Sequence, residues 1–108
     1  MTDPDSRVIA RIWRGTTAAE HGDEYLEYVR RTGIAEYRAT PGFRDVQVLR
    51  RTRDGRTTLT VISYWDSLDA IKAFAGDDPE IAHYYPEDEA YLLEREDRVE
   101  HHEVFDLD

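Results

Sequence analysis

The side chain best suited to acid–base chemistry in this sequence is a histidine that stands among tyrosines. His83 precedes Tyr84 and Tyr85 in the segment PEIAHYYPEDE. An imidazole titrates near neutral pH, so His83 could act as a general base on a phenol, and the tyrosine hydroxyls could bond a quinone or hydroxyl group. The alternative is a surface histidine on a helical turn, beside tyrosines that simply pack.

A tryptophan marks the point where a predicted strand ends and a helix begins. Trp65 follows the alternating segment TTLTVISY and precedes Asp66 and Ser67, both good helix N-caps. Loops at strand ends often carry ligand sites, and a flat indole can pack on a polycyclic ligand while its N–H finds an acceptor. The alternative is a core tryptophan that closes the strand end.

Three further candidates lie on predicted strands. Arg11 and Trp13 share one face of the first strand and could reach the interior of a barrel formed with a second subunit. There the arginine could anchor an anionic or oxygen-rich ligand, or form a salt bridge with the partner's acidic tail. His101 and His102 alternate, so they cannot easily chelate one ion, and we expect no metal site; His101 is a partly buried candidate for ligand contact.

The elements that must position these residues follow from periodicity and turn chemistry. Asp54-Gly55 predicts a tight hairpin turn, because glycine accepts the positive φ that such a turn needs. Gly15 and Gly33 are expected to end the first strand and the first helix. The predicted strands cover residues 7–14, 45–51, 57–65 and 98–105, and the predicted helical segments cover residues 18–31, 34–38, 68–75, 80–85 and 87–93.

The order β-α-β-β-α-β predicts an α+β, ferredoxin-like fold with a four-stranded antiparallel sheet and both helices on one face. The other face is expected to carry some of Ile9, Trp13, Leu49, Ile62 and Tyr64. This is too much apolar surface for a small monomer to leave in water. We therefore expect a homodimer in which two sheets pack face to face as a dimeric α/β barrel.

Composition limits the possible partners and compartments. The 108 residues suit one domain, 1–108, with residues 1–6 frayed. A net charge of −10 disfavours nucleic acid and anionic membranes, and the absence of cysteine excludes disulfides and thiolate chemistry. The apolar run 8–13 is too short for a signal or membrane segment, so we expect a cytoplasmic protein. Residues 38–56 have a net charge of +4 and residues 87–108 a net charge of −8, which favours two solvated faces or attraction between subunits.

Several segments together carry a family resemblance over roughly residues 7–106. They are VIARIWR, TPGF, VISYWDSLDAIKAFAG, DPEIAHYYPEDEAYLLE and RVEHHEVF. The chain resembles the antibiotic biosynthesis monooxygenase domain of the dimeric α/β-barrel superfamily. The resemblance implies a ferredoxin-like fold and a barrel-forming dimer. Family members include oxygenases of aromatic polyketides that use no metal or flavin, and heme-degrading enzymes.

The resemblance also places Trp65 where both oxygenase branches carry a tryptophan near the ligand. It implies a cofactor-independent monooxygenase acting on a flat phenolic, quinoid or polyketide-like compound. The alternatives are a non-catalytic ligand-binding or structural homodimer and, third, a heme-binding or heme-degrading protein, which the missing Asn in residues 7–14 and the missing His in residues 68–75 disfavour. The expected catalytic residues are His83, Trp65 and Tyr85, and the expected substrate-binding residues are Trp65, Arg11, Trp13, Tyr84 and His101.

Overall fold

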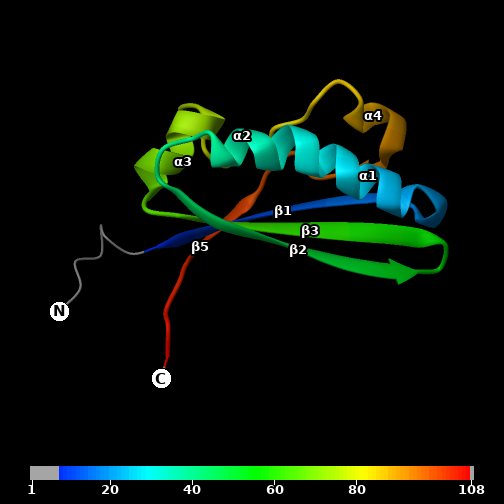
Figure 1. Cartoon of the computed structure of the whole chain (residues 1–108), viewed down its shortest axis with the longest axis horizontal. Coiled ribbons are helices and arrows are strands. Elements are labelled where there is room, and N and C mark those ends of the chain that lie inside the picture. The colour runs from blue at the N-terminus through cyan, green and yellow to red at the C-terminus, as the bar shows by residue number, and fades with distance from the viewer. Residues whose placement is uncertain (1–7, 108) are drawn as a thin grey trace.

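An antiparallel sheet forms the base of the protein in this computed structural model, which describes residues 8–107 (Figure 1). Its order is β2-β3-β1-β4, and β5 also pairs with β1. The strands are β1 (Ile9–Ala18), β2 (Phe43–Arg53), β3 (Arg56–Trp65), β4 (Leu92–Arg95) and β5 (Glu100–Glu103). This α+β arrangement confirms the predicted ferredoxin-like fold.

The last two strands share one edge of the sheet. β5 pairs with residues 9–12 of β1, and β4 pairs with residues 15–17. The sheet is therefore four strands wide, but its final position is filled by two short strands instead of the single strand predicted at 98–105. The prediction of helix over 87–93 was wrong beyond Tyr91, because Leu92–Arg95 takes the open edge beside Gly15.

All four α-helices lie on the same side of the sheet (Figure 1). The helical segments are η2 (Ala19–His21), α1 (Gly22–Val29), η3 (Arg30–Ile34), α2 (Ala35–Arg38), α3 (Leu68–Ala75) and α4 (Asp88–Tyr91). The first four follow one another without a break, so Gly33 does not end the helix as predicted. Instead η3 is a π-helical turn, a wider turn that is often found at functional sites.

The central hairpin and the helix after it agree with the sequence. Asp54 and Gly55 both have positive φ, at 53° and 75°, and they connect β2 to β3. Ser67 caps α3, because its Oγ accepts a hydrogen bond from the Ala70 amide at 3.1 Å. Trp65 therefore ends β3 two residues before a capped helix, as the sequence predicts.

The first strand runs four residues past its predicted end. Gly15 lies inside β1, and a Cβ at this position would meet the Trp13 ring at 2.5 Å and the Leu92 side chain at 2.9 Å. This glycine therefore allows a close approach of side chains and is not a terminator. The strand ends at Ala18, where the chain turns into η2.

The two faces of the sheet differ. On β1 and β3 the odd-numbered residues point toward the helices and are mostly buried, while the even-numbered residues are mostly half-buried on the open face. Arg11 and Trp13 are odd-numbered and contact the helical side, so the expectation that they face a barrel interior was wrong. Ile9 and Trp13 were also predicted as part of the apolar open face, but both lie on the helix-facing side.

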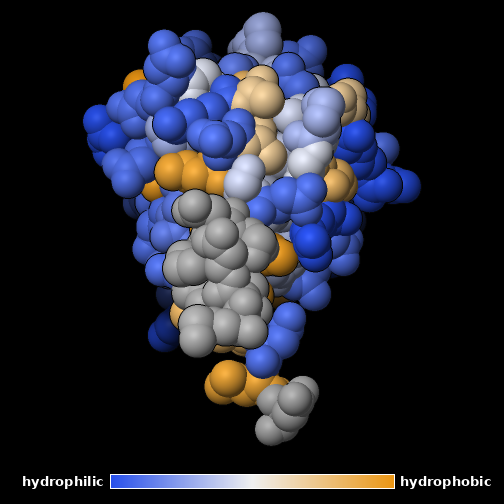
Figure 2. Space-filling model, turned by 90° about the vertical axis from the view of Figure 1, so that its left-hand side faces the viewer, coloured by the Kyte–Doolittle hydropathy of each residue, from blue (hydrophilic) through white to orange (hydrophobic). Residues whose placement is uncertain are grey.

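The open face keeps an apolar centre. Ile12 pairs with Ile62, and Gln47 pairs with Ile62 from the other side. Tyr64 and Leu49 lie on the same face, and Leu49 is 55% exposed. Figure 2, a view from the end where β1 begins, shows a largely hydrophilic surface broken by small hydrophobic areas. No helix within residues 8–107 is long and apolar enough to cross a membrane.

The predicted helical turn over residues 80–85 was wrong. Ile81 forms an isolated bridge with Arg98, and the amides of Ala82 and Val99 donate to the carbonyls of Asp97 and Glu80. Residues 78–81 form a turn, closed by a bond from the Ile81 amide to the Asp78 carbonyl, and the chain beside it pairs with the stretch before β5. The carbonyls that a helix would have used inside itself are therefore free to bond other groups.

Candidate functional site

A small cavity lies between the helical run and the helix-facing side of the sheet. Its volume is about 30 Å³, enough for a water molecule and far below the roughly 150 Å³ that holds a benzene ring. The lining residues are Arg11, Trp13, Val29, Thr32, Gly33, Ile34, Tyr37, Val61, Phe74, His83, Tyr85 and Asp88. The wide turn η3 supplies three of them, so the irregular part of the helix forms one wall.

Arg11 is a buried cation beside this cavity and is only 2% exposed. Its guanidinium donates to the carbonyls of Pro79 and Ile81, the latter at 3.3 Å, and lies 5.6 Å from the Phe74 ring centroid. Among residues 8–107 no carboxylate forms an ion pair with it. Burial lowers the pKa of Arg11, and interaction with the Tyr37 hydroxyl opposes this. The cavity therefore borders on a positive charge whose direct contacts are all neutral groups.

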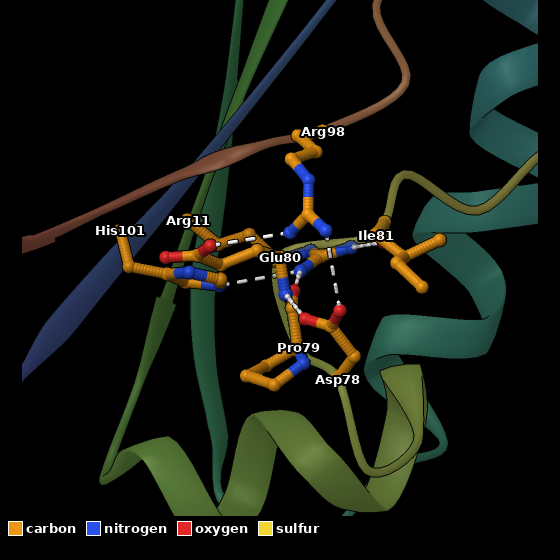
Figure 3. A network of polar contacts seen from close by, with 7 residues as sticks. All are labelled: Arg11, Asp78, Pro79, Glu80, Ile81, Arg98 and His101. Atoms are coloured by element: carbon orange, nitrogen blue, oxygen red, sulfur yellow. Dashed lines mark hydrogen bonds and ion pairs between the residues drawn. The ribbon is translucent and has the colours of Figure 1, made fainter.

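His101 contacts this arginine but does not line the cavity. Its Nε2 lies 3.2 Å from Nη1 of Arg11 (Figure 3). Arginine can only donate, so Nε2 accepts and the histidine is neutral with its proton on Nδ1. Burial, followed by the charge of Arg11, lowers the pKa of His101. His101 thus holds Arg11 in place but does not itself line the cavity, whereas the sequence predicted that it would contact the substrate.

The chain segment 78–81 is held from two sides (Figure 3). Arg11 donates to the carbonyls of Pro79 and Ile81, and Arg98 bonds Asp78 at 3.5 Å and Glu80 at 3.3 Å. His83 and Tyr85 follow directly in the sequence. Arg11 and Arg98 thus form an arginine clamp, and it fixes the start of the segment that carries His83 and Tyr85 to the cavity.

His83 and Tyr85 lie together at the outer side of the cavity. The exposed His83 ring is 5.2 Å from the Phe74 ring and 5.3 Å from the Tyr85 ring, measured between centroids. Among the described residues its ring nitrogens have no hydrogen-bond partner. The Tyr85 hydroxyl donates to Glu36, and burial together with this bond raises the pKa of Tyr85. His83 is thus open to a ligand, whereas Tyr85 presents its ring and keeps its proton.

Trp65 and Tyr84, two other predicted site residues, do not line the cavity. Trp65 is fully buried, donates from its indole N–H to Ser63 Oγ at 2.9 Å, and packs against Tyr37 and Phe74 at 5.6 and 6.2 Å. It therefore supports two lining rings from behind. The Tyr84 hydroxyl donates to the Glu96 carbonyl outside the cavity, although its ring packs on Trp13.

Asp88 lines the cavity but was not among the residues singled out in the sequence. It is 4% exposed, and its two oxygens accept from the Tyr25 hydroxyl at 2.8 Å and the Tyr85 amide at 2.6 Å. The acidic run PEDE gives no sign of which acid turns inward, since an acidic run usually marks a solvated face. Only the docking of α4 on α1 distinguishes Asp88 from its neighbours.

Two buried donors of the cavity lining lack a partner. They are Nε of Arg11 and Nε1 of Trp13, and they are the two such side-chain atoms found within residues 8–107. Buried N–H groups are nearly always bonded, so an unpaired one calls for a water, an ion or a ligand. No three metal-ligating side chains of the described residues come together. The Tyr37 and Tyr84 hydroxyls interact with Arg11 and Trp13 from outside hydrogen-bond geometry, so an acceptor atom of a ligand would compete with them.

Comparison with known proteins gives the family. The model of the antibiotic biosynthesis monooxygenase family matches residues 7–79, well over half of the chain. The chain belongs to this family. A search of curated proteins found no significant match.

Solved structures of the antibiotic biosynthesis monooxygenase type share the fold. A putative member from Bacillus cereus is 20% identical with a TM-score of 0.63, covering 94% of this chain and 97% of its own. SnoaB, a cofactor-independent oxygenase from Streptomyces nogalater, is 21% identical with a TM-score of 0.56 over 94% and 95%. A monooxygenase from the ActVA-Orf6 gene of Streptomyces coelicolor, in complex with nanaomycin D, is 15% identical with a TM-score of 0.52 over 98% and 92%.

Proposed function

We propose that this protein is a monooxygenase that oxidises a flat phenolic or quinoid compound without a metal or flavin. The observation that carries the proposal is the pair of unpartnered buried donors, Arg11 Nε and Trp13 Nε1, in the wall of an aromatic cavity. Neither atom is open to the cavity in its present size, so a planar molecule with acceptor oxygens would satisfy them once the cavity has widened. Membership of the antibiotic biosynthesis monooxygenase family supports the reaction class.

The chemistry needs only the substrate, dioxygen and a base. His83 removes the acidic proton of the substrate, and Arg11 stabilises the resulting oxyanion in a site of low polarity. The electron-rich ring carbon then reduces dioxygen and forms a C–O bond, which gives a peroxide that takes a proton. The O–O bond and the remaining C–H bond break, so that one oxygen atom leaves as water and the other becomes a carbonyl.

Binding such a substrate requires the cavity to widen. At about 30 Å³ it excludes an aromatic ring, so the side chains at its outer side must move. His83 and Tyr85 are the candidates, because His83 is held by ring contacts alone and both lie beyond the clamped segment 78–81. Closure behind the ligand would then exclude water from the oxyanion.

Anthrone provides a direct test, since its enol is a flat phenol and its oxidation gives anthraquinone and water. The protein, treated with a chelator, should form anthraquinone in air and not without oxygen, with one labelled atom from ¹⁸O₂. His83→Gln should lower kcat roughly a hundredfold with little change in KM, while the exposed His21→Gln should match the wild type. A rate no faster than spontaneous oxidation would refute the proposal, and tight binding without turnover would favour the ligand-binding alternative.

We also propose that the protein is a homodimer that pairs the open faces of two sheets. The support is the uncovered apolar centre formed by Ile12, Leu49, Ile62 and Tyr64. On this face β2 carries Arg51 and Arg53 together with Asp45, while Glu94 of β4 and Glu100 of β5 already pair with Arg56 and Arg14 of the same chain. The arrangement that we propose is therefore a two-fold axis that stacks the two apolar centres on each other.

The oligomeric state tests this proposal. Sedimentation should give about twice 12.6 kDa at micromolar concentration. Ile62→Asp should yield monomer or aggregate, because a desolvated carboxylate there has no partner. Leu68→Asp on the exposed surface of α3 is the matched control and should remain dimeric. A monomeric wild-type protein would exclude the barrel.

A further inference from the structure

We infer that the cavity binds its ligand in one fixed orientation, with an ionised oxygen against Arg11 and a neutral hydroxyl group against Asp88. This inference rests on the proposed function and names its substrate class. Arg11 and Asp88 are 2% and 4% exposed, both line the cavity, and neither forms an ion pair among the described residues. Two buried charges of opposite sign thus face one small space without contacting each other.

The elements around the cavity indicate that Arg11 and Asp88 lie toward its opposite ends. Arg11 lies 5.6 Å from the ring centroid of Phe74 in α3, and Tyr25 in α1 donates to Asp88 at 2.8 Å. α3 and α1 lie over opposite ends of the sheet (Figure 1), and twelve residues of one helical run separate Tyr25 from the lining residue Tyr37. The lining residues Val29 and Ile34 fall between them. The cavity therefore has a cationic end and an anionic end, separated by a mostly apolar middle.

The chemistry of each end differs. Arg11 has an unpartnered Nε and can only donate, so it selects an acceptor and favours an anion. Asp88 has about four acceptor positions, of which two are filled by Tyr25 and Tyr85. Its remaining positions select a hydrogen-bond donor and repel a second anion. Elongated aromatic monoanions with a distal hydroxyl fit this arrangement, while dianions and capped hydroxyls do not.

Three anthraquinone derivatives test the ligand preferences of the Arg11 end and the Asp88 end separately. They are 6-hydroxyanthraquinone-2-carboxylate, its methyl ether and anthraquinone-2,6-dicarboxylate, with affinities measured by calorimetry. The hydroxy compound should bind at least about tenfold more tightly than either of the others, because it alone offers a donor to the carboxylate. Arg11→Met should weaken the binding of all three.

The variant Asp88→Asn should raise the affinity for the dicarboxylate about tenfold relative to the hydroxy compound, and the exposed Asp69→Asn should change nothing. If Asp88→Asn fails to fold, the three wild-type affinities decide the matter. Equal wild-type affinities, or a preference unchanged by Asp88→Asn, would overturn the inference while the proposed function stands. If none of the three compounds binds, the inference falls, and the oxidation of anthrone decides the proposed function separately.

Discussion

Replacing Tyr25 by phenylalanine removes one hydroxyl from a fully buried ring and should destabilise the protein markedly. That hydroxyl donates to Asp88 at 2.8 Å. The stacked neighbour Tyr28, with ring centroids 6.1 Å away, is the matched control, because its hydroxyl accepts from the neutral Glu87 amide at 3.1 Å. The two changes delete the same atom from adjacent buried rings and differ mainly in the charge of the partner.

The expected magnitudes follow from that difference. A hydrogen bond to a charged group contributes roughly 1.5–3 kcal/mol, and a neutral one roughly 0.5–1.5 kcal/mol. Tyr25→Phe also leaves the buried Asp88 carboxylate with one donor fewer, whereas Tyr28→Phe frees an amide at the exposed Glu87. We expect the first change to cost at least about 1 kcal/mol more, or roughly 4–8 °C in Tm for a domain of this size.

Urea unfolding of both variants, followed by circular dichroism, measures the two free energies directly. The denaturant slope should be unchanged, so that the shift in midpoint reports stability alone. Equal losses for Tyr25→Phe and Tyr28→Phe would mean that Asp88 is not an ionised buried acceptor. The reasoning about a charged end of the cavity would then fail as well.

Two further predictions concern the arginine clamp and the packing of the first strand. Because burial and Arg11 lower the pKa of His101, its contribution to stability is present above its ordinary pKa of about 6.5 and is lost as pH falls through the depressed value. The His101→Gln variant should therefore lose less stability than the wild type between pH 7.5 and 5, whereas His21→Gln should follow the wild type; parallel wild-type and His101→Gln curves would contradict this. Gly15→Ala places a methyl group 2.5 Å from the Trp13 ring and should cost roughly 1–3 kcal/mol in urea unfolding, whereas an unchanged midpoint would show that the ring moves aside freely.

Local chemistry was enough to predict much of the fold. The Asp54-Gly55 turn and the Ser67 cap act over a few residues, and both form as expected. The errors arose where distant partners decide the outcome. Gly33 suggested a helix end, yet the helix continues through a π-turn, and residues 80–85 suggested a helix, yet Arg11 and the stretch before β5 take their carbonyls and amides.

The candidate site was also predicted only in part, because contacts between distant segments decide which side chains line the cavity. Side-chain type identified Arg11, Trp13, His83 and Tyr85, which all line the cavity. Period two gave the correct pairing of Arg11 with Trp13 on one face but could not say which face the helices cover. Asp88 was missed because one carboxylate in an acidic run looks like the next until tertiary packing turns it inward.

The π-turn η3 makes the cavity depend on the exact length of the chain. A π-turn contains one residue more than the α-helical turn that it replaces. Deleting one residue between Arg30 and Ile34 would remove this extra residue and leave an ordinary α-helical turn, while the helix on either side keeps its orientation. The cavity wall formed by Thr32, Gly33 and Ile34 would then lose its wide turn, whereas Tyr37 would keep its orientation. Within this helical run, the loss of a single residue is therefore expected to reshape one wall of the cavity while the helices before and after it stay in place.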